Sequence, residues 1–103
     1  MTRAALLHIL PDGTWEEALQ LGRYQPPSLA VEGFIHLSWD HQLVATLARH
    51  YDGVGGLSVL VIDPGRLDMN HLVEEAAADA QDRFPHYYEP LPLDAVAAVV
   101  TSG

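Results

Sequence analysis

Residues 57–63 read L-S-V-L-V-I-D and form the most strand-like segment of this 103-residue chain. Their β-branched and apolar side chains are typical of a buried β-strand, and the turn-forming sequence P-G-R at 64–66 ends the run. We therefore predict that this strand lies at the centre of a sheet, with the other apolar segments of the chain as its neighbours.

Three other segments predict strands. Residues 4–10 (A-A-L-L-H-I-L) form an apolar run that stops at P-D-G, which indicates a strand buried on both faces and then a turn. Residues 33–38 (G-F-I-H-L-S) follow the region 23–32, whose two prolines and lack of periodicity predict an ordered loop. Residues 93–100 (L-D-A-V-A-A-V-V) predict a closing strand after a short turn at their start.

The first predicted helix begins at residues 14–17, which read T-W-E-E. This sequence matches a capping box, in which the Thr14 hydroxyl and the Glu17 carboxylate each bind a free backbone N–H at the helix start. Gly22 is a natural C-terminal stop, because glycine adopts the left-handed conformation without strain. We therefore predict a short helix that ends at Gly22.

The second predicted helix covers residues 39–51, with Ser38 as its N-cap. Apolar side chains recur there at spacings of four, which indicates an amphipathic helix. Residues 74–81 are rich in alanine and acidic residues and predict either one or two helical turns or an exposed loop. Because helices do not follow each strand regularly, we predict one α+β domain over 1–103, with a small mixed or antiparallel sheet and two main helices.

Composition excludes several classes of function. Fourteen acidic residues against five arginines give a formal net charge of −9, so nucleic acid and anionic membranes are not expected partners. The chain has no cysteine, which removes disulfides, thiolate metal sites and a cysteine nucleophile. The first apolar run is too short for a membrane span or a secretory signal, so we expect a cytoplasmic protein.

Six histidines are present, and their placement suggests chemistry. His8 and His36 lie in predicted strands, and His86 lies in the proline-bracketed segment 84–92. Each ring either is a structural core residue bound to carbonyl groups or an acid, or converges with the others in one cleft. For His36 we expect poor solvation, because its neighbours in sequence are apolar. The remaining histidines, His41, His50 and His71, are expected to be solvated.

Three imidazoles also fit a zinc site, which stays open as a further alternative. The chain contains no H-E-x-x-H or H-x-H pair, so we assign no metal ligands. Residues 53–56 (G-V-G-G) precede a strand instead of opening a helix, and therefore predict a turn and not a dinucleotide fingerprint. The acidic residues near Glu75 predict a solvated face, from which one carboxylate could reach the histidine cleft.

Three groups of motifs resemble the bacterial domain-of-unknown-function family 952 (DUF952), in the same order. They are L-H-I at 7–9, then P-S-L at 27–29 with E-G-F-I-H-L-S at 32–38, then F-P-H-Y-Y at 84–88 with P-L-P-L-D-A-V at 90–96. The resemblance extends over nearly the whole chain. It implies a fold grouped with the ADP-ribosyltransferase superfamily, in which a split, strongly bent sheet holds NAD in a cleft between its halves.

The resemblance also implies a set of site residues. In that superfamily the first strand supplies a histidine or arginine for the nicotinamide-side ribose, and two later strands supply further polar groups. His8, His36 and His86 occupy these places in order and are the candidate catalytic residues. Ser38 is the candidate ligand-binding residue beside them. Further candidates are Tyr24, Ser28 and Tyr87, with Glu75 as an orienting acid.

The segment I-H-L-S is also similar to the V-H-L-S stretch of the tRNA 2′-phosphotransferases, which use NAD without the usual catalytic glutamate. This chain lacks their basic N-terminal lobe and is acidic, so we do not expect tRNA as substrate. Cleavage of the bond between ribose and nicotinamide depends mainly on positioning and electrostatics. His86 in place of a glutamate would suit an anionic acceptor, or none.

Three functions follow as alternatives. The first is an enzyme that uses NAD as substrate, as an ADP-ribosyl- or phosphotransferase or by cleaving NAD. The second is a module that binds NAD, ADP-ribose or a related nucleotide without turnover. In the third the histidines are structural, and the function lies elsewhere on the surface. In the first two cases the partner is a small nucleotide, and we expect a monomer or a weak homodimer.

Overall fold

The computed structural model describes residues 5–76 and 82–101, which form a small α+β fold with two antiparallel sheets. The four-stranded sheet has the order β3-β1-β4-β7, and the three-stranded sheet has the order β2-β6-β5. The first sheet consists of β3 (Ser38–Trp39), β1 (Leu6–Pro11), β4 (Leu57–Ile62) and β7 (Val96–Thr101). The second consists of β2 (Ile35–His36), β6 (Arg83–Tyr87) and β5 (Leu72–Ala76).

The strand predicted over residues 57–63 is central in its sheet, as predicted. β4 pairs along its whole length with β1, from Leu57 opposite Pro11 to Ile62 opposite Leu6, and it pairs with β7 on its other edge. Burial alternates along β4, so this strand buries one face only. In β1 the consecutive residues Leu6, Leu7 and His8 are all buried, which confirms the prediction of two covered faces.

The first helix is present, but its predicted cap is wrong. α1 (Thr14–Leu21) has Gly13 as its N-cap, with φ 89° and no side-chain cap hydrogen bond. Thr14 is therefore the first helical residue, because the left-handed turn at Gly13 starts the helix one residue earlier than a capping box would. The predicted stop at Gly22 is confirmed: its φ is 77°, and its N–H donates to the Ala18 carbonyl oxygen at 2.8 Å.

The loop predicted for 23–32 contains a third helix. α2 (Pro27–Glu32) begins with proline at its first position and ends at Gly33, which has φ 88°. The two prolines led to the prediction of a loop, although the fixed φ and missing N–H of proline are well suited to a first helical turn. The last residue of this helix, Glu32, contacts His36 of β2.

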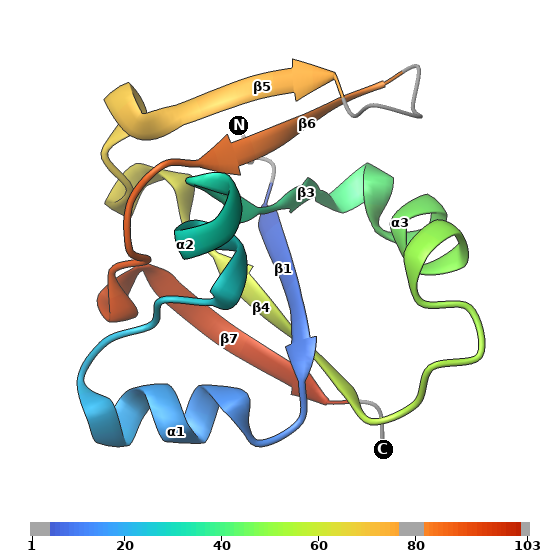
Figure 1. The fold of residues 1–103 in the computed structure, drawn as a ribbon, viewed down its shortest axis with the longest axis horizontal. Coiled ribbons are helices and arrows are strands. Elements are labelled where there is room, and N and C mark those ends of the chain that lie inside the picture. The colour runs from blue at the N-terminus through green and yellow to red at the C-terminus, as the bar shows by residue number, and fades with distance from the viewer. Residues whose placement is uncertain (1–4, 77–81, 102–103) are drawn as a thin grey trace.

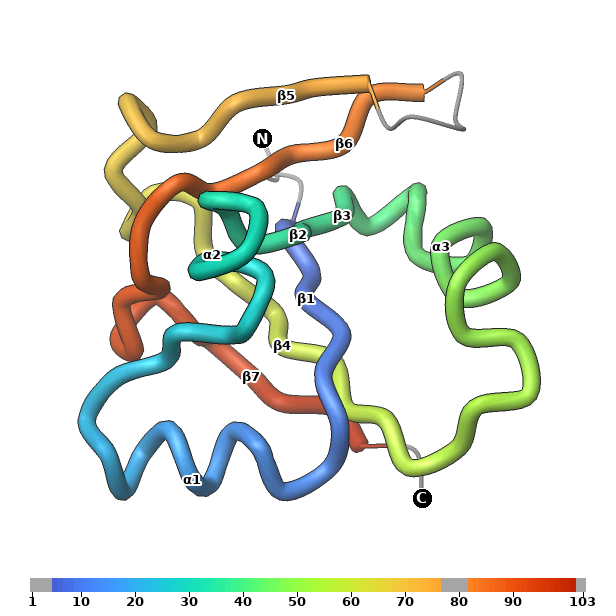
Figure 2. Tube along the Cα trace, in the orientation of Figure 1, coloured from blue at the N-terminus to red at the C-terminus, as the bar shows by residue number. Residues whose placement is uncertain are grey.

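The strand predicted for 33–38 is split between the two sheets. β2 pairs with β6, whereas β3 pairs with the start of β1, and Leu37 lies between them with its N–H bound to the Pro85 carbonyl oxygen at 3.0 Å. Figure 2 shows the chain crossing the beginning of β1 at this point. The apolar run thus marks the junction of two sheets, and a single strand was the wrong prediction.

The predicted second helix starts later than expected and is preceded by a separate short helix. A short 3-10 helix, η1 (Asp40–Gln42), precedes α3 (Leu43–His50), and Ser38 belongs to β3 instead of acting as N-cap. The Gln42 side chain binds the Trp39 N–H at 3.0 Å and the Arg83 carbonyl oxygen at 2.7 Å, which joins this helix to β6. The amphipathic stripe is only partly covered, since α3 contains no buried residue.

Two further segments complete the fold. After β4 come η2 (Pro64–Arg66) and η3 (Met69–His71), and residues 72–76 form β5, so a helix over this part of 74–81 was wrong. Residues 77–81 lie outside the described residues. Residues 93–95 form η4 (Leu93–Ala95) before β7. Within the described part of the chain, no helix is both long and apolar enough to cross a membrane.

The core lies between the four-stranded sheet, α1 and the inner face of β6. Its fully or nearly fully buried members include Leu6, Leu10, Trp15, Tyr24, Ile35, Leu60, Ile62, Tyr87 and Leu91. These residues come from both sheets and from the segments between them. The same apolar cluster therefore fixes the position of one sheet against the other.

Candidate functional site

A cleft of about 1110 Å³ lies beside the junction of the two sheets. Its lining comes from β1, α1, α2, β2, α3 and β6. Most of the candidate residues line it, namely His8, Tyr24, Ser28, His36, Ser38 and His86. The structure therefore brings together side chains that are far apart in the sequence.

His8 lies in the floor of the cleft and has both ring nitrogens bound. Its Nδ1 donates to the His36 carbonyl oxygen at 2.7 Å, and its Nε2 accepts from the Tyr24 hydroxyl at 2.6 Å. A carbonyl only accepts, so the proton of the neutral ring is on Nδ1. Burial lowers the pKa of His8 from 6.5 to about 4, and burial also raises the pKa of Tyr24 to about 12.

The position of this histidine has a structural explanation. β1 pairs with β3, but the chain leaves that sheet at His36, so the His36 carbonyl oxygen has no partner strand on the side facing β1. The His8 ring supplies the missing hydrogen bond between the two sheets. A polar side chain in the apolar run of β1 is therefore needed at the place where the sheets separate.

His86 has a different environment. Its Nδ1 is 2.9 Å from Glu75 Oε1, and its ring stacks on Phe34 with centroids 4.0 Å apart. The Tyr88 hydroxyl donates to the same Glu75 oxygen, and these two hydrogen bonds, that of Tyr88 first, lower the pKa of the Glu75 carboxyl. An ionised Glu75 keeps the proton of His86 on Nδ1. This leaves Nε2 as a proton acceptor, and it forms no hydrogen bond with any described residue.

The expected burial of His36 is wrong. Its side chain is 56% exposed and forms an ion pair with Glu32, one helical turn earlier. The reason is the split of the predicted strand: β2 is only two residues long, and side chains alternate along it, so Ile35 enters the core while His36 faces outward. Its ring still lies beside the His86 ring, with centroids 5.3 Å apart, at the rim of the cleft.

Tyr87, a ligand-binding candidate from the sequence, lies apart from the other candidates. It follows His86 in β6 and therefore points to the opposite face of the sheet, where it is fully buried. Its hydroxyl donates to Glu89 Oε2 at 2.6 Å and accepts from the Asp68 N–H at 3.2 Å. Burial is the main cause that raises the pKa of Tyr87 to about 12. Tyr87 does not line the cleft.

The two serine candidates have modest roles in the geometry. The Thr46 hydroxyl donates to the Gln42 carbonyl oxygen at 3.0 Å, so the Ser38 hydroxyl is the donor in its 3.2 Å contact with Thr46. Ser38 is buried and connects β3 to α3. Ser28 is half-buried on α2 and also lines the cleft.

With this geometry established, comparison with known proteins identifies the family. Residues 9–99 match the model of a family described as "Protein of unknown function (DUF952)". The chain belongs to the DUF952 family. The family prediction is therefore confirmed. A comparison of this DUF952 chain with curated proteins found no match.

Solved structures of protein CC0527 from Caulobacter crescentus are similar to this DUF952 chain. The crystal structure has a TM-score of 0.80 and 31% identity, covering 93% of this chain and 83% of CC0527. A crystal structure of a double mutant of CC0527 has a TM-score of 0.80, 30% identity and the same coverage. The solution NMR structure has a TM-score of 0.78 and 31% identity over 93% and 82% of the two chains. The grouping with ADP-ribosyltransferases is not tested by these matches and stays a prediction.

Sequence reasoning missed several residues of the DUF952 cleft. Phe34 contacts the rings of His36, His86 and Tyr88, and its place two residues before His36 was the available signal. Arg23 and Arg49 contribute positive charge to the lining, and Glu17 and Glu32 contribute negative charge. Arg23, Arg49 and Glu17 lie outside the family motifs, whereas Glu32 opens the motif at 32–38. Only the fold shows that these charges meet in one cleft.

The cleft histidines do not form a ligand set for a metal. Both nitrogens of His8 are already bound within the protein, and His36 faces Glu32. Among the described residues, metal-binding atoms from three or more side chains come within 4.8 Å of one another at Asp68, His71 and Glu89 and at no other place. This group lies outside the lining of the DUF952 cleft.

Proposed function

We propose that the cleft binds NAD and cleaves its bond between ribose and nicotinamide, with His86 as general base and Glu75 as the carboxylate that orients it. The observation that carries the proposal is His86 in the lining of a cleft of about 1110 Å³, with its Nδ1 bound from outside that lining by Glu75. Small-molecule sites commonly measure about 300–1,000 Å³, so the cleft has room for a dinucleotide.

The charges of the lining support a dinucleotide in particular. Arg23 and Arg49 can pair with the diphosphate, since arginine binds phosphate oxygens in a bidentate manner. The Phe34 ring offers an aromatic face for a base, and it already stacks on His86. Glu17 and Glu32 add carboxylates that stabilise positive charge developing on the ribose.

The proposed reaction balances in protons and electrons. The bond between ribose C1′ and the nicotinamide nitrogen breaks, and its electron pair leaves with nicotinamide. Water attacks C1′ while its proton passes to Nε2 of His86, and the ionised Glu75 carboxylate stabilises the resulting imidazolium. The products are ADP-ribose, nicotinamide and one proton. An anionic acceptor in place of water needs no base, which gives a transferase at the same site.

His8 takes a positioning role in this scheme. Its pKa of about 4 keeps the ring neutral at physiological pH, and both nitrogens are engaged with His36 and Tyr24. A ribose hydroxyl can bind there only by replacing the Tyr24 hydroxyl at Nε2. His8 therefore acts on the nucleotide through the shape and hydrogen bonding of the cleft floor, and takes no proton during the reaction.

One observation favours the second candidate, a binding module without turnover. Both ring nitrogens of His8 are hydrogen-bonded to other groups of the protein, as expected of a residue that maintains the shape of a cleft and takes no part in a reaction. This module would bind NAD or ADP-ribose with the same arginines and aromatic face. The two candidates differ in the use of Nε2 of His86, so they can be separated by experiment.

The test combines NMR and an assay on the same sample. The imidazole signals are followed while NAD or ADP-ribose is added, and nicotinamide is measured over time. We expect saturable shifts at His86 and His36, and nicotinamide release that falls at least about 100-fold in His86→Gln, the loss typical of a removed general base. Glu75→Gln should retain binding and lose rate.

His41→Gln is the matched control, because His41 is exposed and outside the lining of the cleft. It should leave both binding and rate unchanged. Saturable shifts without nicotinamide release, also with a cell extract as source of acceptors, would replace the enzyme with the binding module. No shift at any cleft histidine with millimolar NAD would exclude both.

A further inference from the structure

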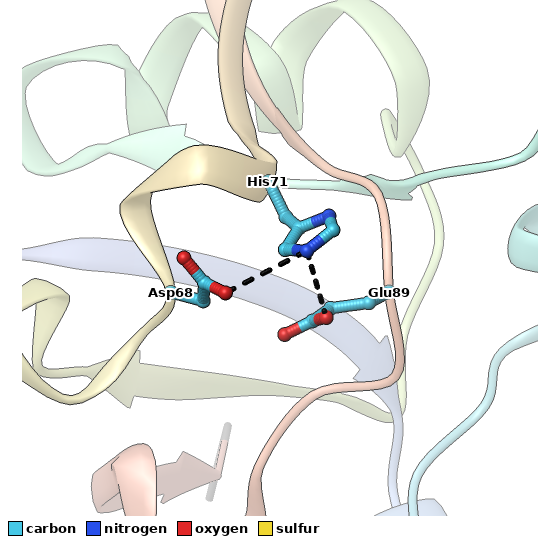
Figure 3. A group of neighbouring side chains, drawn as sticks. All are labelled: Asp68, His71 and Glu89. Atoms are coloured by element: carbon cyan, nitrogen blue, oxygen red, sulfur yellow. Dashed lines mark ion pairs between the residues drawn. The ribbon is translucent and has the colours of Figure 1, made fainter.

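We propose that Asp68, His71 and Glu89 form a binding site for a divalent transition-metal ion of the zinc type. The three side chains come from the start and end of η3 and from the segment that follows β6 (Figure 3). They lie on the side of β6 that carries Tyr87, and none lines the cleft. The proposal is therefore independent of the nucleotide chemistry.

The distances in this cluster fit an ion better than hydrogen bonds. His71 Nε2 is 3.6 Å from Asp68 Oδ2 and 3.4 Å from Glu89 Oε1, and all three ligand atoms lie within 4.8 Å of one another. Hydrogen bonds between nitrogen and oxygen measure about 2.7–3.2 Å. Ligand atoms bound tetrahedrally to zinc at about 2.0–2.2 Å are about 3.3–3.6 Å apart.

Each carboxylate is held by its other oxygen. Asp68 Oδ1 accepts the Asn70 N–H at 3.0 Å, and Glu89 Oε2 accepts the Tyr87 hydroxyl at 2.6 Å. The remaining oxygens, Oδ2 and Oε1, are the ones turned toward His71 (Figure 3). Such outer hydrogen bonds orient metal ligands and commonly change metal affinity by about 10–100-fold.

The backbone holds the two contributing segments together before any ion binds. The Tyr87 hydroxyl accepts the Asp68 N–H at 3.2 Å, and the His71 carbonyl oxygen accepts the Tyr88 N–H at 2.9 Å. The buried Tyr87 thus positions Asp68 and Glu89 at once. Little conformational entropy is lost when an ion binds to ligands that are already in place.

The donor set indicates the class of ion. One imidazole and two carboxylates suit zinc or a similar first-row metal, and three protein ligands leave a fourth position for water. Two carboxylate charges match a divalent cation when His71 is neutral. The three side chains are between 33% and 47% exposed, so an ion can enter from solvent.

The test uses the full chain after treatment with a chelator, titrated with zinc chloride at neutral pH by calorimetry. We expect one equivalent to bind, with a rise in Tm on zinc addition and a shift of the His71 imidazole signals in NMR spectra. His71→Gln and Glu89→Gln should each weaken binding at least tenfold and remove the rise in Tm. Tyr87→Phe, which loses only the outer hydroxyl, should weaken it about tenfold.

His41→Gln is again the matched control, since His41 lies 3.8 Å from Asp40 but belongs to no group of three potential metal ligands among the described residues. It should bind zinc like the unmodified chain. Circular dichroism of each variant without metal verifies the fold, and the half-exposed side chains of His71 and Glu89 make unfolding unexpected. The proposal is overturned if zinc binds without saturation. It is overturned equally if zinc binding survives His71→Gln and is lost in His36→Gln, which would locate the ion in the cleft.

Discussion

The floor and the rim of the cleft use histidine in opposite ways. In the floor, His8 is buried, neutral and bound at both nitrogens. At the rim, His86 is equally buried, but only one of its nitrogens is bound, by a carboxylate, and its ring stacks on Phe34 next to the exposed His36. The number of nitrogens used within the protein separates a histidine that maintains the fold from one that is available for chemistry.

The difference arises from the position of each ring relative to the split between the sheets. His8 fills the gap at the point where β1 loses its neighbour, so its polar groups replace backbone hydrogen bonds. His86 lies within the three-stranded sheet, where the backbone is already paired with β2 and β5. Its side chain is therefore not required for pairing. The following predictions test this contrast, from the largest expected effect to the smallest.

His8→Leu should reduce the free energy of unfolding most. The change leaves the buried Tyr24 hydroxyl and the His36 carbonyl oxygen without partners, at about 1–3 kcal/mol each, hence about 2–6 kcal/mol in all. His36→Leu is the matched variant at the rim, and it should change stability by about 1 kcal/mol or less. Urea denaturation measures both, and equal losses would contradict the contrast.

Acid should destabilise the protein through His8. The unfolded chain takes up this proton near pH 6.5 and the folded chain only near pH 4, so the unfolded state binds more protons between these values. Stability therefore falls as the pH falls from 6.5 to 4, by about 3 kcal/mol from this residue. The measurement is the unfolding free energy of the wild type and of His8→Gln across this range. Parallel curves for the two proteins would refute the assignment.

Tyr24→Phe should cost less than His8→Leu, because it removes the partner of one nitrogen only. The His8 Nε2 acceptor stays buried without a donor, which costs about 1–3 kcal/mol. Tyr51→Phe is a matched control in the same cleft, since the Tyr51 hydroxyl forms no hydrogen bond with a described residue. Thermal and urea unfolding of the two variants should differ by this amount, and similar stabilities would argue against the pairing.

Tyr88→Phe should have the smallest effect on stability, but it should change the pKa of Glu75, which binds His86 at the rim. The Tyr88 hydroxyl is the main cause of the lowered pKa of Glu75, so its removal should raise that pKa toward the ordinary value. Titration of the Glu75 carboxyl carbon by NMR measures the change. If this pKa does not move, the Tyr88 hydroxyl does not bind Glu75 in solution.

Elements with a strong local pattern were predicted well. Three examples are the alternating burial of β4, the buried start of β1 and the helix end at Gly22. Each depends on the properties of residues that are close in sequence, so the sequence pattern predicts it. Predictions failed where a local pattern had two solutions. Pro27 is compatible with a loop as well as with the first position of a helix, so α2 was predicted as a loop. The apolar run before Ser38 was compatible with one strand as well as with two strands in different sheets.

The site residues, like the elements of the fold, could be predicted from the sequence only in part. The motifs around His8, His36 and His86 identified the family and the side chains that meet in the cleft, because spacing and residue type are properties of the chain itself. They did not show that Tyr87 lies outside the cleft while its neighbour His86 lines it, because the face to which a strand residue points depends on which neighbour lies in the core. They also missed Arg23 and Arg49, which belong to no shared motif, and Phe34, which lies in the motif at 32–38 but was not recognised as part of the site.

The sequence by itself determined the family, the α+β class, the central strand and three histidines as residues of interest. Only the tertiary structure decided that His8 closes the gap between two sheets, that Glu75 holds His86, and that Asp68, His71 and Glu89 come together. The physical reason is the range of the interactions. Hydrophobic periodicity acts between near neighbours, whereas hydrogen bonds and ion pairs between distant segments exist only once the packed core has fixed both sheets.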